Sequence, residues 1–274
     1  MRKKLLRKGI ILFKSCQMLH VPSCFLLFFL VSLFLSRHQI PMVQSAFYAI
    51  PFSFAAMGCF AINDVYDYDK DVINKPYRIL PMGLITRQRA FQTGCFLFFL
   101  SAIGAIGVSQ NTYELFLYFF AIILAFIYGR FINYLSKIKS VYTAIVIAIP
   151  LFFVVYKSSM EIDSFSLLLA VILYITGKEL MMDIYDMEGD KESGQYTIPV
   201  QWGEKRTFIL AAIVQIVSLA LFKVRLEVAA HIIVLCFSYL GICYYIWLNK
   251  DRIWRRFVVY CLWLPLVICL IVVM

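Results

Sequence analysis

Two acidic clusters with the same spacing are the part of this sequence best suited to chemistry. They contain the pattern Asp-x2-Asp-x3-Asp, with members Asp64, Asp67 and Asp71 in the first and Asp183, Asp186 and Asp190 in the second. Offsets of three and seven residues place the three carboxylates of each pattern on one face of a helix. We therefore expect two carboxylate triads, with Asp69 and Glu188 off the shared face, in solvent or in a supporting role.

Carboxylates gathered in this way need a cation. Each triad follows an apolar segment, and an Asp at the centre of a bilayer costs about 2.5–3.5 kcal/mol. Mg²⁺ binds one or two carboxylates and fills its octahedron with water and substrate phosphate oxygens. Two triads that share a diphosphate through Mg²⁺ ions fit this chemistry. The alternative is a pair of solvated helix ends, but the repeated spacing favours a metal site.

The composition indicates a chain embedded in a bilayer. Hydrophobic residues make up 62% of the chain and charged residues 15%, whereas a soluble domain usually carries about 25% charged residues. The net charge is +10, but the positive charges lie in short gaps between apolar runs, which is not the basic face of a nucleic-acid-binding protein. Eight cysteines without a Cys-x-x-Cys pair, and three scattered histidines, give no support for zinc, haem or a disulfide framework.

Apolar runs long enough to cross a bilayer recur along the chain. The predicted spans are residues 19–36, 42–62, 90–108, 112–130, 141–157, 164–182, 207–223, 228–248 and 255–273. They predict an all-α polytopic membrane protein, with nine transmembrane helices in one bundle around a central cytoplasm-facing cavity. Residues 1–274 form a single domain in this interpretation. Residues 1–18 are a basic interfacial segment, because no small-x-small cleavage site follows the first apolar run.

The positive charges predict the orientation in the membrane. With nine spans and a cytoplasmic N-terminus, nearly all of the 26 Lys and Arg residues fall in or beside cytoplasmic segments. The exceptions are Arg37, Lys157, Lys223 and Arg225. Both acidic clusters then emerge on the cytoplasmic side, four spans apart, where they can face one cavity.

The loops beyond the clusters carry further candidate residues. Pro76, Pro81 and Gly83 predict a shaped loop after the first cluster, in which Lys75 and Arg78 can donate to phosphate oxygens. Lys191 follows the second cluster in a similar layout, and the loop after the fourth span offers Tyr134, Lys137 and Lys139. The alternative for each cation is ordinary cytoplasmic positive charge.

At these residues the sequence resembles the UbiA family of intramembrane prenyltransferases. The matching elements are Asn63-Asp64-x2-Asp67-x3-Asp71, Asn74-Lys75-Pro76-x-Arg78, Asp183-x2-Asp186-x3-Asp190, and the run of Lys191, Gly194, Thr197-Ile198-Pro199 and Gly203. The resemblance spans roughly residues 40–205 and is consistent with nine helices. It implies Mg²⁺-dependent transfer of a prenyl group from a polyprenyl diphosphate to a small-molecule acceptor, either an aromatic quinone precursor or a glycerophosphate.

The resemblance also implies roles for individual residues. The metal ligands would be Asn63, Asp67, Asp71, Asp183, Asp186 and Asp190, and the substrate-binding residues would be Asn63, Asp64 and Lys191. The catalytic residues, which neutralise the leaving diphosphate or lie beside it, would be Lys139, Arg78, Lys75 and Tyr134. An apolar, aromatic-lined cavity would shield the allylic cation from water.

The sequence also indicates a branch of the family, and it leaves two other functions open. The run from Gly177 to Asp183 is similar to the archaeal-lipid and homogentisate branches, and His20-Val21-Pro22 stands where the family often has Arg-Pro. One alternative is a UbiA-type terpene cyclase, which shares the metal site. Another is a cation carrier or channel, which would place charges along the spans instead of at their ends.

Overall fold

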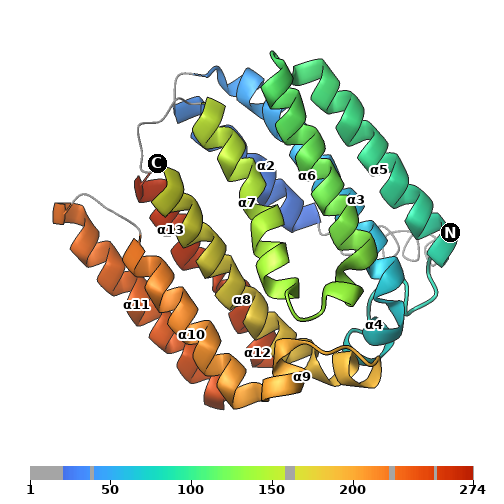
Figure 1. Ribbon diagram of the computed structural model, residues 1–274. Helices are drawn as coiled ribbons and strands as arrows, with labels where there is room; N and C mark the ends of the chain where they lie inside the picture. The colour runs from blue at the N-terminus through green and yellow to red at the C-terminus, as the bar shows by residue number, and fades with distance from the viewer. Residues whose placement is uncertain (1–20, 38–39, 158–163, 222–225, 250–251, 274) are drawn as a thin grey trace, which may run out of the picture. The chain divides into compact units, whose positions relative to one another are not determined.

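A computed structural model of the chain describes residues 21–37, 40–157, 164–221, 226–249 and 252–273. Every regular element within these ranges is helical, which confirms the all-α prediction (Figure 1). The predicted interfacial segment over residues 1–18 lies outside the described residues. Within the described ranges, helices cover most of the predicted apolar runs.

The helices differ widely in length. They are α2 (Val21–Arg37), α3 (Met42–Tyr66), α4 (Tyr68–Asn74), α5 (Arg87–Val108), α6 (Thr112–Phe131), η1 (Ile132–Leu135), α7 (Lys139–Lys157), α8 (Ser164–Glu192), α9 (Ile198–Trp202), α10 (Glu204–Leu221), α11 (Leu226–Asn249), α12 (Arg252–Cys261) and α13 (Trp263–Val273). Five of those described are long and apolar enough to cross a membrane: α3, α5, α6, α7 and residues 165–192 of α8. The bundle of nine spans with a central cavity stays a prediction.

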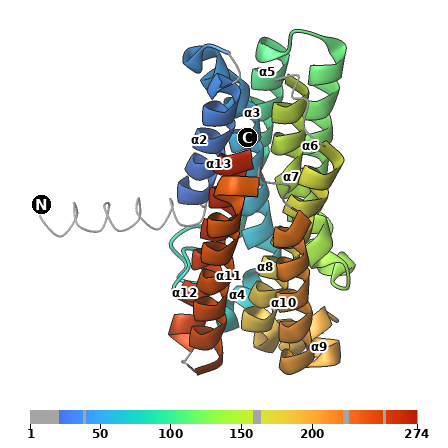
Figure 2. The same ribbon diagram turned by 90° about the vertical axis from the view of Figure 1, so that its left-hand side faces the viewer.

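The chain divides into two compact units, and the division crosses α7. The first unit comprises residues 1–135 and 149–159, and the second comprises residues 136–148 and 160–274. Within the first unit, α3 packs against α2, α5 and α6 (Figure 1). Within the second unit, α8 packs against α9, α10 and α12. Figure 2 shows α8 beside α10. Each unit therefore contains one helix that carries an acidic cluster and the neighbours that hold it.

Close backbone contacts fix the end of α3 that carries the first cluster. A Cβ atom added to Gly94 of α5 would lie 2.5 Å from Cγ1 of Ile62, and one added to Gly129 of α6 would lie 2.9 Å from the carbonyl oxygen of Cys59. Small residues allow membrane helices to approach this closely. The turn of α3 immediately before Asn63 is therefore held by two neighbouring helices.

The ninth predicted span is wrong as a single helix, because the structure divides it at Leu262 into α12 and α13. Pro265 has no N–H to donate to the carbonyl of Cys261, so the ladder of helical hydrogen bonds is interrupted there. Tyrosines of neighbouring helices donate to the carbonyls at the break: Tyr239 to Cys261 at 3.2 Å and Tyr174 to Leu262 at 2.8 Å. The break is thus stabilised by α8 and α11.

Candidate functional site

The first acidic cluster lies at a junction between two helices. α3 ends at Tyr66, Asp67 adopts φ −88° and ψ 3°, and α4 begins at Tyr68. The prediction that this triad lies on one uninterrupted helix is therefore wrong. Short acidic side chains have low helix propensity, and like charges four residues apart, as at Asp67 and Asp71, destabilise a helix. Hydrogen bonds still cross the junction, from the N–H of Asp67 to Asn63 O and from the N–H of Asp71 to Asp67 O, both at 2.8 Å.

Arg78 brings the two ends of the first triad together. Its Nη1 atom lies 2.6 Å from Oδ1 of Asp64 and 2.7 Å from Oδ2 of Asp71. Both carboxylates are buried, each 3% exposed. Burial raises the pKa of the Asp71 carboxyl, although the charges of Arg78 and Lys75 lower it, and the net shift is upward. The structure thus brings Arg78 against Asp64 and Asp71, while the role of Arg78 toward a diphosphate stays a prediction.

The loop after α4 holds Arg78 in place. Ile79 and Leu80 are buried and pack with Ala61 and Ala90, while Gly83 adopts a positive φ of 66° that favours glycine. Hydrogen bonds from Gly83 N to Leu80 O (2.9 Å) and from Leu84 N to Ile79 O (3.0 Å) close the turn. The shaped loop predicted from its prolines and glycine is confirmed, and its apolar anchor aims the adjacent arginine at the carboxylates.

Two lysines also pair with the first triad. Lys70 Nζ lies 2.8 Å from Oδ1 of Asp67, and Lys75 Nζ lies 3.7 Å from Oδ1 of Asp71. The sequence analysis assigned no role to Lys70, although its spacing of three residues from Asp67 is the signal for such a pair. The carboxylates of this cluster are therefore matched by three nearby cations.

The second cluster lies on one continuous helix, as predicted. Asp183, Asp186 and Asp190 all belong to α8 and are 2%, 8% and 0% exposed. The helix ends just beyond them, where Gly194 adopts φ 72° and the N–H of Gln195 donates to Asp190 O at 2.8 Å, a typical glycine cap. The three carboxylates thus occupy the last turns of the span, and not its middle.

Lys139 and Ser140 belong to the second cluster. Lys139 Nζ lies 2.7 Å from Oδ1 of Asp183, and the hydroxyl of Ser140 donates to Oδ2 of the same carboxylate at 2.6 Å. Both residues begin α7 and are buried. Sequence reasoning named Lys139 and missed Ser140, whose only signal was its position beside that lysine.

The other predicted residues lie at the surface. Tyr134 is 79% exposed on η1, with its ring near Phe131, and Lys191 is exposed at the end of α8. Their functional roles stay predictions. Asp69 and Glu188 are exposed, as expected for acids off the shared faces, and Asp69 pairs with exposed Arg87 at 2.9 Å.

The donor atoms of the first cluster fit a hard divalent cation. The side-chain oxygen of Asn63 is buried and accepts no hydrogen bond from the residues that the structure describes, while its Nδ2 donates to Asp67 Oδ2 at 2.8 Å. Amide and carboxylate oxygens are ligands that Mg²⁺ accepts. Among the described residues, no group of three or more His, Cys, Asp or Glu side chains is placed to hold a metal ion. The Mg²⁺ site stays a prediction.

Comparison with known proteins identifies the family. The model of the UbiA prenyltransferase family matches residues 25–272. The chain belongs to this family. It is also 34% identical to digeranylgeranylglyceryl phosphate synthase of Pyrococcus horikoshii over 64% of this chain and 62% of that protein, and 32% identical to the same-named protein of Sulfolobus acidocaldarius over 59% and 58%. The matched region thus spans less than two thirds of either relative.

Solved structures of UbiA homologues have the same fold. A UbiA homologue from Archaeoglobus fulgidus bound to GPP and Mg²⁺ superimposes with a TM-score of 0.72 at 16% identity, covering 95% of this chain and 99% of that one. The apo structure of a UbiA homologue from Aeropyrum pernix K1 gives 0.69 at 20% identity, covering 95% of each chain. The UbiA fold therefore extends over nearly the whole chain.

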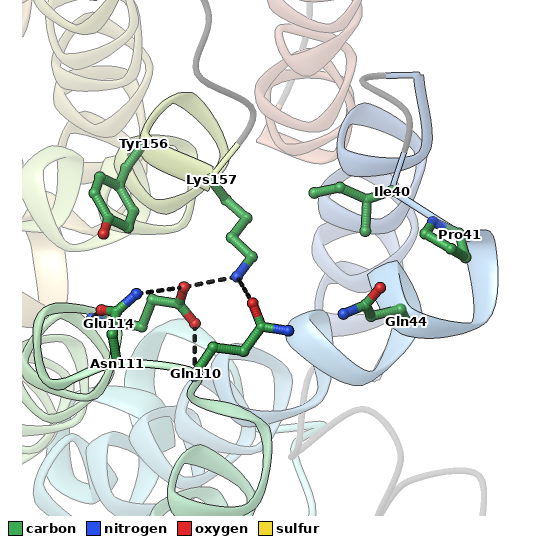
Figure 3. Close-up of a pocket in the computed structure, with 8 residues that line it drawn as sticks. All are labelled: Ile40, Pro41, Gln44, Gln110, Asn111, Glu114, Tyr156 and Lys157. Atoms are coloured by element: carbon green, nitrogen blue, oxygen red, sulfur yellow. Dashed lines mark hydrogen bonds and ion pairs between the residues drawn. The ribbon is translucent and has the colours of Figure 1, made fainter.

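A polar pocket that includes Pro41 and Gln44 lies beside the start of α3 (Figure 3). The first acidic cluster lies at the other end of that helix. The pocket has a volume of about 490 Å³ and is lined by Ile40, Pro41, Gln44, Gln110, Asn111, Glu114, Tyr156 and Lys157. Lys157 Nζ lies 2.6 Å from Glu114 Oε1 and donates to Gln110 Oε1 at 2.7 Å. Glu114 also accepts from the N–H of Gln110, and its own N–H donates to Oδ1 of Asn111, the N-cap residue of α6. This network joins α6 to the end of α7.

We expect the Glu114–Lys157 pair to stabilise the first unit. Replacing Glu114 with alanine leaves the partly buried Lys157 ammonium without its carboxylate and removes the acceptor of the Gln110 N–H, so the free energy of unfolding should fall by about 2–3 kcal/mol. Thermal unfolding in detergent measures the effect. Asp69→Ala, which breaks the exposed pair with Arg87, is the control and should cost about 0–1 kcal/mol. Equal effects of the two changes would contradict a structural role for the buried pair.

Proposed function

We propose that this protein transfers a prenyl group from a polyprenyl diphosphate to a glycerophosphate-type acceptor in the membrane. The observation that carries the proposal is the pair of buried acidic clusters, each held with basic side chains at the end of an apolar helix. Membership of a prenyltransferase family supports the reaction class. The names of the curated relatives favour a glycerophosphate acceptor over an aromatic one.

The proposed Mg²⁺ ligands are the side chains listed from the family resemblance. They are Asn63, Asp67 and Asp71 of the first cluster and Asp183, Asp186 and Asp190 of the second. Asp64 and Lys191 would assist in holding the diphosphate. When bound, Mg²⁺ neutralises the negative charge that develops on a departing diphosphate. The buried amide oxygen of Asn63 and the buried carboxylates support this assignment.

The basic residues would bind the diphosphate directly. Arg78 carries five N–H donors in a planar group, and one of its terminal nitrogens is shared between two carboxylates. Lys139 is held by Asp183 in a similar way. We infer that both cations, together with Lys75, stabilise the leaving group, because positioned charges act most strongly in a buried site. Tyr134 would lie beside them when substrate is bound.

The membrane setting proposed for the site follows the charge pattern. The N-terminus and both clusters would lie on the cytoplasmic side, the chain would form one nine-span domain, and the prenyl tail would extend into the apolar interior. The five long apolar helices among the described residues support an integral membrane protein. Proteolysis at the exposed Arg87, where α5 begins, in oriented proteoliposomes would test which side of the membrane this end of α5 faces.

Product analysis tests the proposed reaction. Membranes that contain the protein are incubated with Mg²⁺, labelled geranylgeranyl diphosphate, and a pool of glycerophosphates and quinone precursors. We expect a prenylated glycerophosphate by mass spectrometry and no product when EDTA removes Mg²⁺. A hydrocarbon formed from the diphosphate alone would indicate a terpene cyclase, and ion flux without any product would indicate a carrier. Either result would overturn the proposal.

A further inference from the structure

A buried ion pair lies within α8, one turn before the second acidic cluster. Lys178 Nζ and Glu179 Oε1 are 2.5 Å apart, and their side chains are only 9% and 12% exposed. Both residues belong to the apolar segment Phe165–Glu192 that is long enough to cross a membrane. Ionisable residues inside a span are costly and generally serve a function. The proposed diphosphate site accounts for the aspartates but not for this pair.

Glu179 lies on the acidic face of α8. Asp183, Asp186 and Asp190 follow it by 4, 7 and 11 residues, and at 100° per residue all four side chains fall within an arc of about 60°. The opposite face is occupied by α10, because a Cβ atom added to Gly177 would lie 2.5 Å from Cγ of Gln215. Glu179 therefore continues the line of carboxylates, about 6 Å further from the end of the helix than Asp183.

The geometry of this pair differs from that of a structural ion pair. Glu114 and Lys157 join two helices, α6 and α7. Lys178 and Glu179 are neighbours on one helix, so their attraction ties no elements together and caps no helix end. Lys178 Nζ also lies 4.6 Å from the ring centroid of Trp263 on α13. The aromatic face stabilises the ammonium, which in turn neutralises the carboxylate beside it.

The position of Glu179 along α8 is where the proposed reaction needs a group that can take a proton. The role inferred for Glu179 rests on that proposed reaction. If the aspartates hold the diphosphate, the prenyl chain must extend from it toward the apolar part of the span. The carbon that is attacked, C1, is bonded to the diphosphate and lies just on the apolar side of it. An acceptor hydroxyl must reach C1 at this level, about one turn of α8 from the aspartates toward the start of the helix. It must also lose a proton.

We propose that Glu179 is the base that accepts the proton of the acceptor hydroxyl. The C1–O bond of the prenyl diphosphate breaks and its electron pair leaves with the diphosphate. The acceptor oxygen forms the new bond to C1, and its proton passes to the Glu179 carboxylate. Lys178 is a positioning residue that holds this carboxylate in place through their ion pair. The acceptor is thus a hydroxyl compound, consistent with a glycerophosphate.

The test compares two acceptors with the Glu179→Gln protein. With geranylgeranylglyceryl phosphate, transfer should fall by about 100-fold, because a general base contributes about 10²–10⁴-fold. With an analogue in which a thiol replaces the attacked hydroxyl, assayed above the pKa of the thiol, no proton needs to be removed. The same variant should then transfer at a rate within about fivefold of the unmodified protein. Glu179→Asp should recover part of the activity toward the hydroxyl acceptor.

Controls separate the possible causes of a loss. Glu188→Gln changes an exposed acid on the opposite side of α8 and should leave both activities unchanged. Binding of a non-cleavable prenyl thiolodiphosphate with Mg²⁺ should be unaffected by Glu179→Gln. Equal losses with both acceptors, or wild-type activity of the variant with the hydroxyl acceptor, would overturn the role of Glu179. If the unmodified protein transfers to neither acceptor, the proposed function itself fails.

Discussion

Replacing Asp186 with alanine should lower the rate of prenyl transfer by about 10²–10³-fold, the usual effect of removing one electrostatic element from a preorganised site. Asp67→Ala should have a similar effect, although Asp67 lies in the other unit of the chain. If both residues bind one metal–diphosphate complex, they act together. The double variant should then be little slower than either single variant, because effects within one catalytic assembly are far from additive.

The measurement is release of diphosphate from a labelled prenyl diphosphate at saturating Mg²⁺ and acceptor. Asp69→Ala is the matched control, because this aspartate lies in the first cluster with its side chain 80% exposed. Its rate should stay within about twofold of the unmodified protein, as expected for a surface substitution. Diphosphate release that persists in both the Asp67 and Asp186 variants would rule out the proposed metal site.

Replacing Arg78 with alanine should affect both stability and activity. The change leaves two buried carboxylates, Asp64 and Asp71, without the cation they share, so unfolding should become easier by about 3–5 kcal/mol. It also removes the strongest donor proposed for the diphosphate. Prenyl transfer should fall even at temperatures where the variant is fully folded. Added Mg²⁺ should recover part of the stability, because a divalent cation can neutralise the same carboxylates.

Arg87→Ala provides the comparison for Arg78. Arg87 pairs with Asp69 at the surface, and an exposed pair contributes about 0–1 kcal/mol. Unfolding in detergent, followed by circular dichroism with and without Mg²⁺, measures both variants. If the Arg78→Ala and Arg87→Ala proteins are equally stable, the bridge that Arg78 makes between Asp64 and Asp71 does not stabilise the first cluster. If Arg78→Lys restores stability but not transfer, the planar donor group is needed for the reaction itself.

The sequence predicted what depends on composition and short-range spacing. Runs of about 20 apolar residues located the long helices, and the second triad lies on one helix because nothing between Asp183 and Asp190 interrupts α8. The shaped loop after the first cluster followed from Pro76, Pro81 and Gly83. Each of these features is determined by residues that lie close together in the sequence, so a single sequence was enough to predict it.

Features that depend on contacts between distant residues could not be predicted in this way. The bridge from Arg78 to Asp64 requires the loop to fold back on the apolar anchor of Ile79 and Leu80. The break at Leu262 depends on tyrosines of two other helices as well as on Pro265. The pairing of Ser140 with Asp183 spans 43 residues. In each case the deciding partner is far away along the chain.

Binding of a non-cleavable prenyl thiolodiphosphate in the presence of Mg²⁺ tests most directly whether the two clusters serve one site. Calorimetry on the unmodified protein and on the Asp71→Asn and Asp186→Asn variants gives both stoichiometry and affinity. We expect one diphosphate per chain and a loss of affinity of at least about 10-fold in each variant. A variant that binds with unchanged affinity, or a second diphosphate bound per chain, would show that the clusters act separately.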